Sequence, residues 1–126
     1  LAARRLSPAG AVALEAAVAA CEGHLARLGE AEPAAYYQLN LRFHATVAEA
    51  AGNPFLLDLI KTNARKLMAY YRARYAYAGS ITDSVRDHRA IAALIAARDS
   101  AGAEEAMRRH CQFDQVTAMD LLAALG

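Results

Sequence analysis

Apolar residues recur every three or four positions along most of the chain, which is the spacing of a helix with one buried face. The first run follows Ser7 as N-cap and predicts a helix over 8–29. The second run predicts a helix over 33–51. Gly52 and Pro54 end it, because glycine suits a left-handed C-cap and proline cannot continue the hydrogen-bond ladder.

The same periodicity continues through the second half of the chain, where it predicts three more helices. The first of them spans 54–77. Ser84 and Asp87 have the S-x-x-D form of a capping box, which predicts a helix over 84–98. A fifth helix is predicted over 101–124. Five helices with short connections predict an all-α, antiparallel helical bundle.

The composition favours one helical domain over 1–126. Alanine supplies 33 of the 126 residues and the hydrophobic fraction is 56%, which suits close-packed helices. Only 7 Gly and 3 Pro are present, which excludes collagen-like and disordered classes. A sandwich or barrel is also disfavoured, because β-branched residues are few and no Asn-Gly or Asp-Gly hairpin signal occurs.

The charge balance argues against a nucleic-acid-binding surface. The chain has 14 Lys and Arg against 13 Asp and Glu, and it has no basic run. Cys21 and Cys111 are far apart in the sequence and predict reduced thiols in a cytoplasmic protein. Charged residues interrupt the apolar runs, so we expect no membrane partner. Since the chain starts at Leu1 rather than Met, we expect it to be part of a longer protein.

Four polar side chains lie on the apolar faces of the predicted helices. Asn40 and His44 are one turn apart on the second helix. His88 lies among apolar positions of the fourth helix, and His110 shares a stripe with Phe113 on the fifth. One metal ion would satisfy all three buried imidazoles, with the Asn40 oxygen as a fourth donor. Such a site suits zinc, nickel, copper or iron and leaves room for an anion such as a carboxylate.

Two other interpretations of these histidines stay open. Each can be a core residue with its own hydrogen-bond partner, in a metal-free dimerisation bundle. Alternatively, the metal can activate water in a hydrolase-like enzyme, where Asp87 is already used as a cap and Asp114 is a candidate partner of His110. No H-E-x-x-H motif and no pair of E-x-x-H motifs supports that enzyme. His24 stands in a polar stretch and is predicted to be a solvated surface residue.

Four short motifs stand in register along the chain. They are Leu39-Asn40-Leu41-Arg42-Phe43-His44, Ala50-Ala51-Gly52-Asn53-Pro54, Ser84-Val85-Arg86-Asp87-His88-Arg89-Ala90-Ile91 and Ala106-Met107-Arg108-Arg109-His110. In order, in spacing and in the helices between them, these motifs resemble the ligand-binding C-terminal domain of FadR-type GntR transcription regulators, called FCD. The resemblance covers nearly the whole chain.

The resemblance implies a bundle of six or seven helices that dimerises, follows a winged helix-turn-helix and often holds a divalent metal through one Asp or Asn and three His. Matched position by position, these ligands fall on Asn40, His44, His88 and His110. Asn40 stands where Asp is commoner, so a bound metal would keep its full charge and attract an anion more strongly. The chain begins after the expected DNA-binding domain and the first one or two helices of the family fold, so we expect DNA binding only through that missing domain.

The sequence therefore predicts the effector-sensing and dimerisation domain of a GntR/FadR-type transcription regulator and not an enzyme. A small organic acid would bind at a zinc or nickel ion. Arg72 and Arg74 are candidates for holding its carboxylate, because arginine matches carboxylates bidentately; they can equally form the solvated face of a long helix. The sequence leaves open which acid is sensed, which metal is native, and whether the protein represses or activates its genes.

Overall fold

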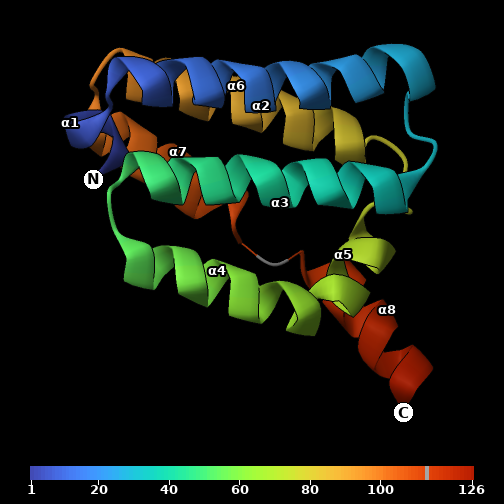
Figure 1. Ribbon diagram of the computed structural model, residues 1–126. Coiled ribbons are helices and arrows are strands. Elements are labelled where there is room, and N and C mark those ends of the chain that lie inside the picture. The colour runs from blue at the N-terminus through green and yellow to red at the C-terminus, as the bar shows by residue number, and fades with distance from the viewer. Residues whose placement is uncertain (113) are drawn as a thin grey trace.

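The protein is a bundle of α-helices (Figure 1). The computed structural model describes residues 1–112 and 114–126, and it contains no strand within these ranges. Phe113, which the sequence placed on an apolar stripe, lies outside the described residues. The helices are α1 (Ala2–Arg5), α2 (Pro8–Leu28), α3 (Pro33–Ala50), α4 (Pro54–Lys66), α5 (Met68–Arg74), α6 (Ser80–Ala96), α7 (Ser100–His110) and α8 (Gln115–Leu125). The predicted all-α bundle is confirmed.

Two clusters of buried side chains hold the bundle together. α2 lies along both α3 and α6 and runs antiparallel to them, while α4 lies on the far side of α3 (Figure 1). The larger members of the first cluster are Leu6, Leu14, Val18, Phe43, Ile91 and Ile95. The second cluster contains Cys21, Tyr36, Tyr37, Tyr75, Ile81 and Val85. The two clusters occupy opposite ends of α3 and α6, so the middle of each of these helices lies between them.

The N-cap that the sequence predicts at Ser7 is present, and two further helix starts are capped by side chains in the same way. Ser7 accepts the backbone N–H of Gly10 at 3.0 Å and precedes α2. Asn53 caps α4, and Asp99 caps α7 by accepting the N–H of Gly102 at 2.9 Å. Each cap satisfies an amide that has no partner inside its helix, which fixes where the helix begins.

The predicted single helix over 54–77 is wrong, because the segment forms two helices. α4 ends at Lys66, Leu67 has φ −90° and ψ −3°, and α5 starts at Met68. A break of one residue leaves the apolar spacing intact, so periodicity alone does not reveal it. The break lets α5 turn towards α8 while α4 stays against α3 (Figure 1).

The predicted helix over 101–124 is also two helices. α7 ends at His110, and Asp114 caps α8 by accepting from the N–H and the hydroxyl group of Thr117 at 2.8 and 2.7 Å. The sequence pattern does not reveal this break, because Asp114 fits equally well as an exposed polar position of one continuous helix. As a result, His110 stands at a helix end rather than in the middle of a helix.

The predicted start of a helix at Ser84 is wrong, since α6 begins four residues earlier at Ser80. Ser84 is buried inside α6 and accepts a hydrogen bond of 2.7 Å from the hydroxyl group of Tyr36. Asp87 is not part of a capping box, because its carboxylate binds His110. The S-x-x-D pattern here serves contacts between helices.

The start of α6 is capped from outside the helix. Glu30, in the turn after α2, accepts the N–H groups of Ile81 and Thr82, each at 3.0 Å. These are two of the amides that a helix start leaves without internal partners. Gly79 precedes them with φ 83°, a conformation that glycine adopts without strain. A cap supplied from so far along the chain has no local sequence signal.

By length and composition, α2 is long and apolar enough to span a membrane; it is the one such helix in the described part of the chain. The sequence analysis expected charged residues to make every apolar run too short for a membrane helix, and for α2 this expectation is wrong. In the structure Glu15 and Glu22 of α2 pair with Arg89 of α6, and the helix packs along α3 and α6. These contacts are those of a helix packed in a bundle, and such helices can also be long and apolar enough to span a membrane.

Glu30→Ala should destabilise the fold by about 1 kcal/mol at neutral pH, because Ile81 and Thr82 lose their acceptor. Burial alone would raise the pKa of Glu30, but the hydrogen bonds from Thr82 and Ile81 outweigh it and lower the pKa. This stabilisation is therefore present above the ordinary carboxyl pKa and is lost as the pH falls through the lower folded value. Urea unfolding at neutral and at acid pH measures it.

Glu104→Ala, at an exposed position of α7, is the matched control and should change the free energy of unfolding little. Equal losses in the two variants would contradict the capping role of Glu30.

Candidate functional site

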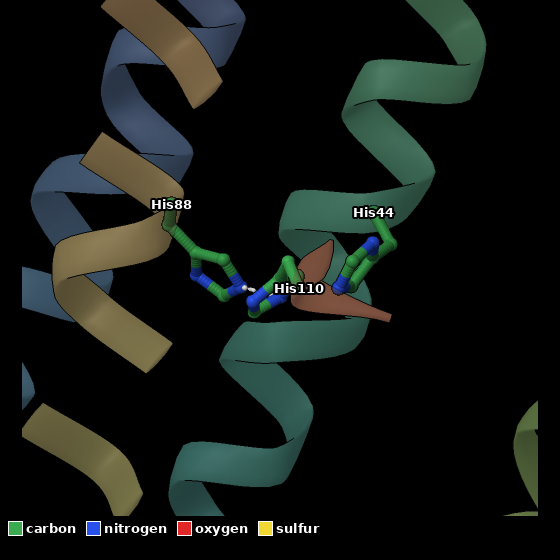
Figure 2. A group of neighbouring side chains, drawn as sticks. All are labelled: His44, His88 and His110. Atoms are coloured by element: carbon green, nitrogen blue, oxygen red, sulfur yellow. Dashed lines mark hydrogen bonds between the residues drawn. The ribbon is translucent and has the colours of Figure 1, made fainter. Parts of the chain in front are cut away.

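Three histidines from three helices converge in the middle of the bundle (Figure 2). His44 comes from α3, His88 from α6, and His110 from the end of α7. Their nearest ring nitrogens all lie within 4.8 Å of one another. The structure thus brings together the three imidazoles that the sequence selected as a group.

The rings are held in place by aromatic packing. His88 has no exposed surface, and its ring stacks on Phe43 with centroids 3.9 Å apart and planes 18° apart. The rings of His44 and His110 lie parallel within 16°, with centroids 5.3 Å apart. Packing on an apolar ring leaves the edge of His88, where the nitrogens are, free to face its neighbours.

One carboxylate fixes the orientation of His110. Its Nδ1 lies 3.1 Å from Oδ2 of Asp87, and a neutral His110 donates the Nδ1 proton to this oxygen. The Nε2 atom of His110 is then an acceptor, and it lies 3.1 Å from Nε2 of His88 (Figure 2). In this tautomer one proton lies between the two Nε2 atoms, and a metal ion can take its place.

Burial keeps two of the imidazoles uncharged. Desolvation, followed by the influence of His110, lowers the pKa of His44 to about 3. Desolvation, together with His44 and His110, lowers the pKa of His88 to about 2. Neutral imidazole is the form that coordinates metals, so neither ring has to lose a proton to solvent at neutral pH.

Asn40 lies one helical turn before His44 and has only 2% of its surface exposed. Its Oδ1 atom is buried and has no hydrogen-bond partner, and the same holds for Nδ1 of His88; these two are the unsatisfied buried side-chain atoms among the described residues. A buried polar atom without a partner costs about 1–3 kcal/mol. Both atoms belong to the four residues that the sequence selected.

These donors fit a divalent metal. Metal–nitrogen bonds of about 2.0–2.1 Å place neighbouring ligand atoms roughly 3–3.5 Å apart. The two facing Nε2 atoms already have this spacing at 3.1 Å, and the ligand nitrogens of all three histidines lie within 4.8 Å of one another. Oδ1 of Asn40, buried without a partner one turn before His44, is the candidate for a fourth donor.

Two cavities border the cluster. A polar cavity of about 330 Å³ includes His110 and Arg74 in its lining, and an apolar cavity of about 370 Å³ includes Asn40 and His44. Tyr71 lines both. Small-molecule sites typically have volumes of this order.

Of the two arginines selected from the sequence, Arg74 lines the polar cavity, whereas Arg72 is exposed and lines neither cavity. The polar cavity also contains Arg86 and Arg109, which the sequence analysis did not single out. Arg109 stands next to His110 in the chain, and this adjacency is the signal that could have found it.

Two predictions near the site are wrong. His24 is not a surface residue: only 3% of it is exposed, and its Nε2 lies 2.9 Å from the carbonyl oxygen of Ala31. Its polar neighbours in sequence occupy other faces of α2. Asp114 is not the partner of His110, because its carboxylate oxygen binds Thr117 and caps α8.

Asp87→Ala removes the acceptor that orients His110. Partners of this kind are typically worth about 10–100-fold in metal affinity, so we expect Zn²⁺ to bind at least about tenfold more weakly. Competition with a chromophoric chelator measures the affinity. Asp83→Ala is the matched control, because Asp83 lies one turn earlier on α6, lines the same polar cavity and pairs with Arg86. Unchanged affinity in Asp87→Ala would refute the orienting role.

Comparisons with known proteins assign most of the chain to a family. A search of curated proteins and a search of solved structures found no match. The family model described as FCD domain matches residues 1–113, which include Asn40 and the three clustered histidines. FCD domains are regulatory, all-helical domains, in agreement with the fold. The chain therefore belongs to the FCD family.

Proposed function

We propose that this chain is the effector-sensing and dimerisation domain of a GntR/FadR-type transcription regulator. It binds a small organic acid at a divalent metal, zinc or nickel, held by Asn40, His44, His88 and His110. It acts in the cytoplasm as a homodimer and reaches DNA through a separate winged helix-turn-helix domain. Membership of the FCD family supports the regulatory role and argues against catalysis.

The observation that carries the proposal is the convergence of the donor set. Three imidazole nitrogens lie within 4.8 Å of one another, and Oδ1 of Asn40 is buried without a partner one turn from His44. A bound divalent metal would supply positive charge and an open coordination position. All four protein donors are neutral, so this charge would not be offset within the site and would attract a carboxylate.

The polar cavity supplies a second positive group for the same carboxylate. Arg86 pairs with Asp83 and Asp87, and Arg109 lies 3.5 Å from Glu105. Arg74 has no carboxylate within ion-pair distance in the part of the chain that the structure describes. An arginine without an internal ion pair can bind an incoming acid without giving up an existing one.

The donors also suggest how binding is transmitted. They come from α3, α6 and α7, so an acid held at the metal favours the arrangement in which these three helices converge most closely. Its differential affinity for two helix arrangements shifts their populations and thereby the spacing of the paired DNA-binding domains. His110 ends α7, so such a change reaches the connection to α8 directly.

His44→Ala and His88→Ala should each lose most of the bound metal, because the donor set loses one of its three nitrogens. Elemental analysis of protein purified without added metal measures the metal content per chain. His24→Gln is the matched control, since His24 is a buried histidine on α2 outside the cluster. Variants of His44 and His88 that keep the wild-type metal content would overturn the proposal.

Arg74→Gln should weaken acetate binding to the zinc-loaded chain by about tenfold or more, the usual effect of losing a hydrogen bond between charged groups. Arg72→Gln, two residues earlier and outside the cavity, should bind acetate as the wild type does. Isothermal titration calorimetry measures both affinities. If the two variants behave alike, Arg74 does not hold the carboxylate.

A further inference from the structure

The apolar cavity beside the histidine cluster is unlike the polar cavity on its other side. Its wall is formed by α3 on one side and α4 on the other, with α7 and Tyr71 closing the end at the cluster. Five of its lining residues are polar or aromatic, and the other ten are aliphatic or sulfur-containing. The five are Tyr37, Asn40, His44, Asn63 and Tyr71, and the ten are Leu41, Val47, Ala48, Leu56, Leu59, Ile60, Ala64, Leu67, Met107 and Cys111.

The helix that covers this cavity is poorly anchored. α4 has no buried residue and packs mainly against α3 and α5. Leu56 and Leu59 line the cavity, yet they keep 37% and 44% of their surface exposed. An apolar body in the cavity would remove this surface from water, and burial of apolar surface favours binding.

We propose that the effector is a carboxylate with an apolar body that fills the cavity between α3 and α4. This inference rests on the proposed function, because the carboxylate is the group held at the metal. Two of the four proposed metal donors, Asn40 and His44, line the cavity directly. Asn40 is only 2% exposed and its buried oxygen lacks a partner, so the proposed metal and the place for the apolar body are adjacent.

The volume of the cavity sets the size of the apolar body. An apolar cavity of about 150 Å³ is large enough to bind benzene. At about 370 Å³ this cavity holds more than twice that volume, which is room for roughly eight or more carbon atoms. Acids of one to three carbons, such as acetate, leave most of it unfilled.

A series of straight-chain acids tests the proposal. Acetate, butyrate, hexanoate and octanoate are titrated into the zinc-loaded chain by calorimetry. We expect affinity to rise about fourfold for each methylene group that enters the cavity, the usual effect of burying one methylene. Octanoate, but not acetate, should also slow amide hydrogen exchange in α4, because the filled cavity anchors that helix.

A matched pair of variants locates the binding site. Ala64→Leu adds an aliphatic side chain to the lining and should weaken octanoate binding by about tenfold, while acetate binds as before. Thr62→Leu makes a similar change on α4, at an exposed position that does not line the cavity, and should leave both affinities unchanged. Unaltered acetate binding shows in the same experiment that the Ala64→Leu protein is folded.

The outcomes separate this inference from the proposed function. If acetate binds in a zinc-dependent way but affinity does not rise with chain length, the apolar body is refuted and the proposed function stands. The same result is expected if a second copy of the chain fills the cavity, in which case Ala64→Leu would alter the oligomeric state. If no acid of any length binds the zinc-loaded chain, the proposed function itself is refuted, and this inference with it.

Discussion

The need to satisfy three imidazoles in one small space, one of them buried and two partly buried, shapes the centre of this bundle. A polar group removed from water must find a partner inside the protein, and a mostly apolar interior offers few. The Nε2 atoms of His88 and His110 meet this need by lying 3.1 Å apart. The Nδ1 atom of His110 forms a hydrogen bond with the carboxylate of Asp87. Oδ1 of Asn40 and Nδ1 of His88 remain without partners. Three helices must therefore meet at a fixed relative position.

Contacts outside the cluster keep those helices in position. Glu30 caps α6 across the α2–α3 turn, and this sets where along the bundle His88 lies. Tyr36 binds Ser84 and ties α3 to α6 one turn from His88. α7 ends at His110, so its imidazole lies where the chain leaves the bundle. The fold thus holds two of the histidines inside helices and the third at a helix end.

The sequence predicted the fold class and the convergence of the histidines because both depend on helical periodicity. Asn40 and His44 lie one turn apart on an apolar face, and such a face is buried in a bundle. Periodicity could not reveal the break at Leu67, since one residue does not disturb it. The burial of His24 and the pairing of Asp87 with His110 depend on residues that only the tertiary fold brings near. The N-terminal cap by Glu30 is missing from the sequence pattern for the same reason.

The two cavities give the cluster different surroundings on its two sides, one with Arg74 and one with aliphatic side chains. A metal centre beside both cavities would bind the carboxylate of an effector. The apolar cavity would then select effectors by their hydrocarbon part. Anomalous scattering from crystals of protein purified without added metal tests the existence of that centre most directly. We predict a single peak at about 2.0–2.1 Å from a nitrogen of each of the three histidines, with the Asn40 oxygen as a fourth ligand. No peak, with His88 and His110 still hydrogen-bonded to each other, would contradict the account.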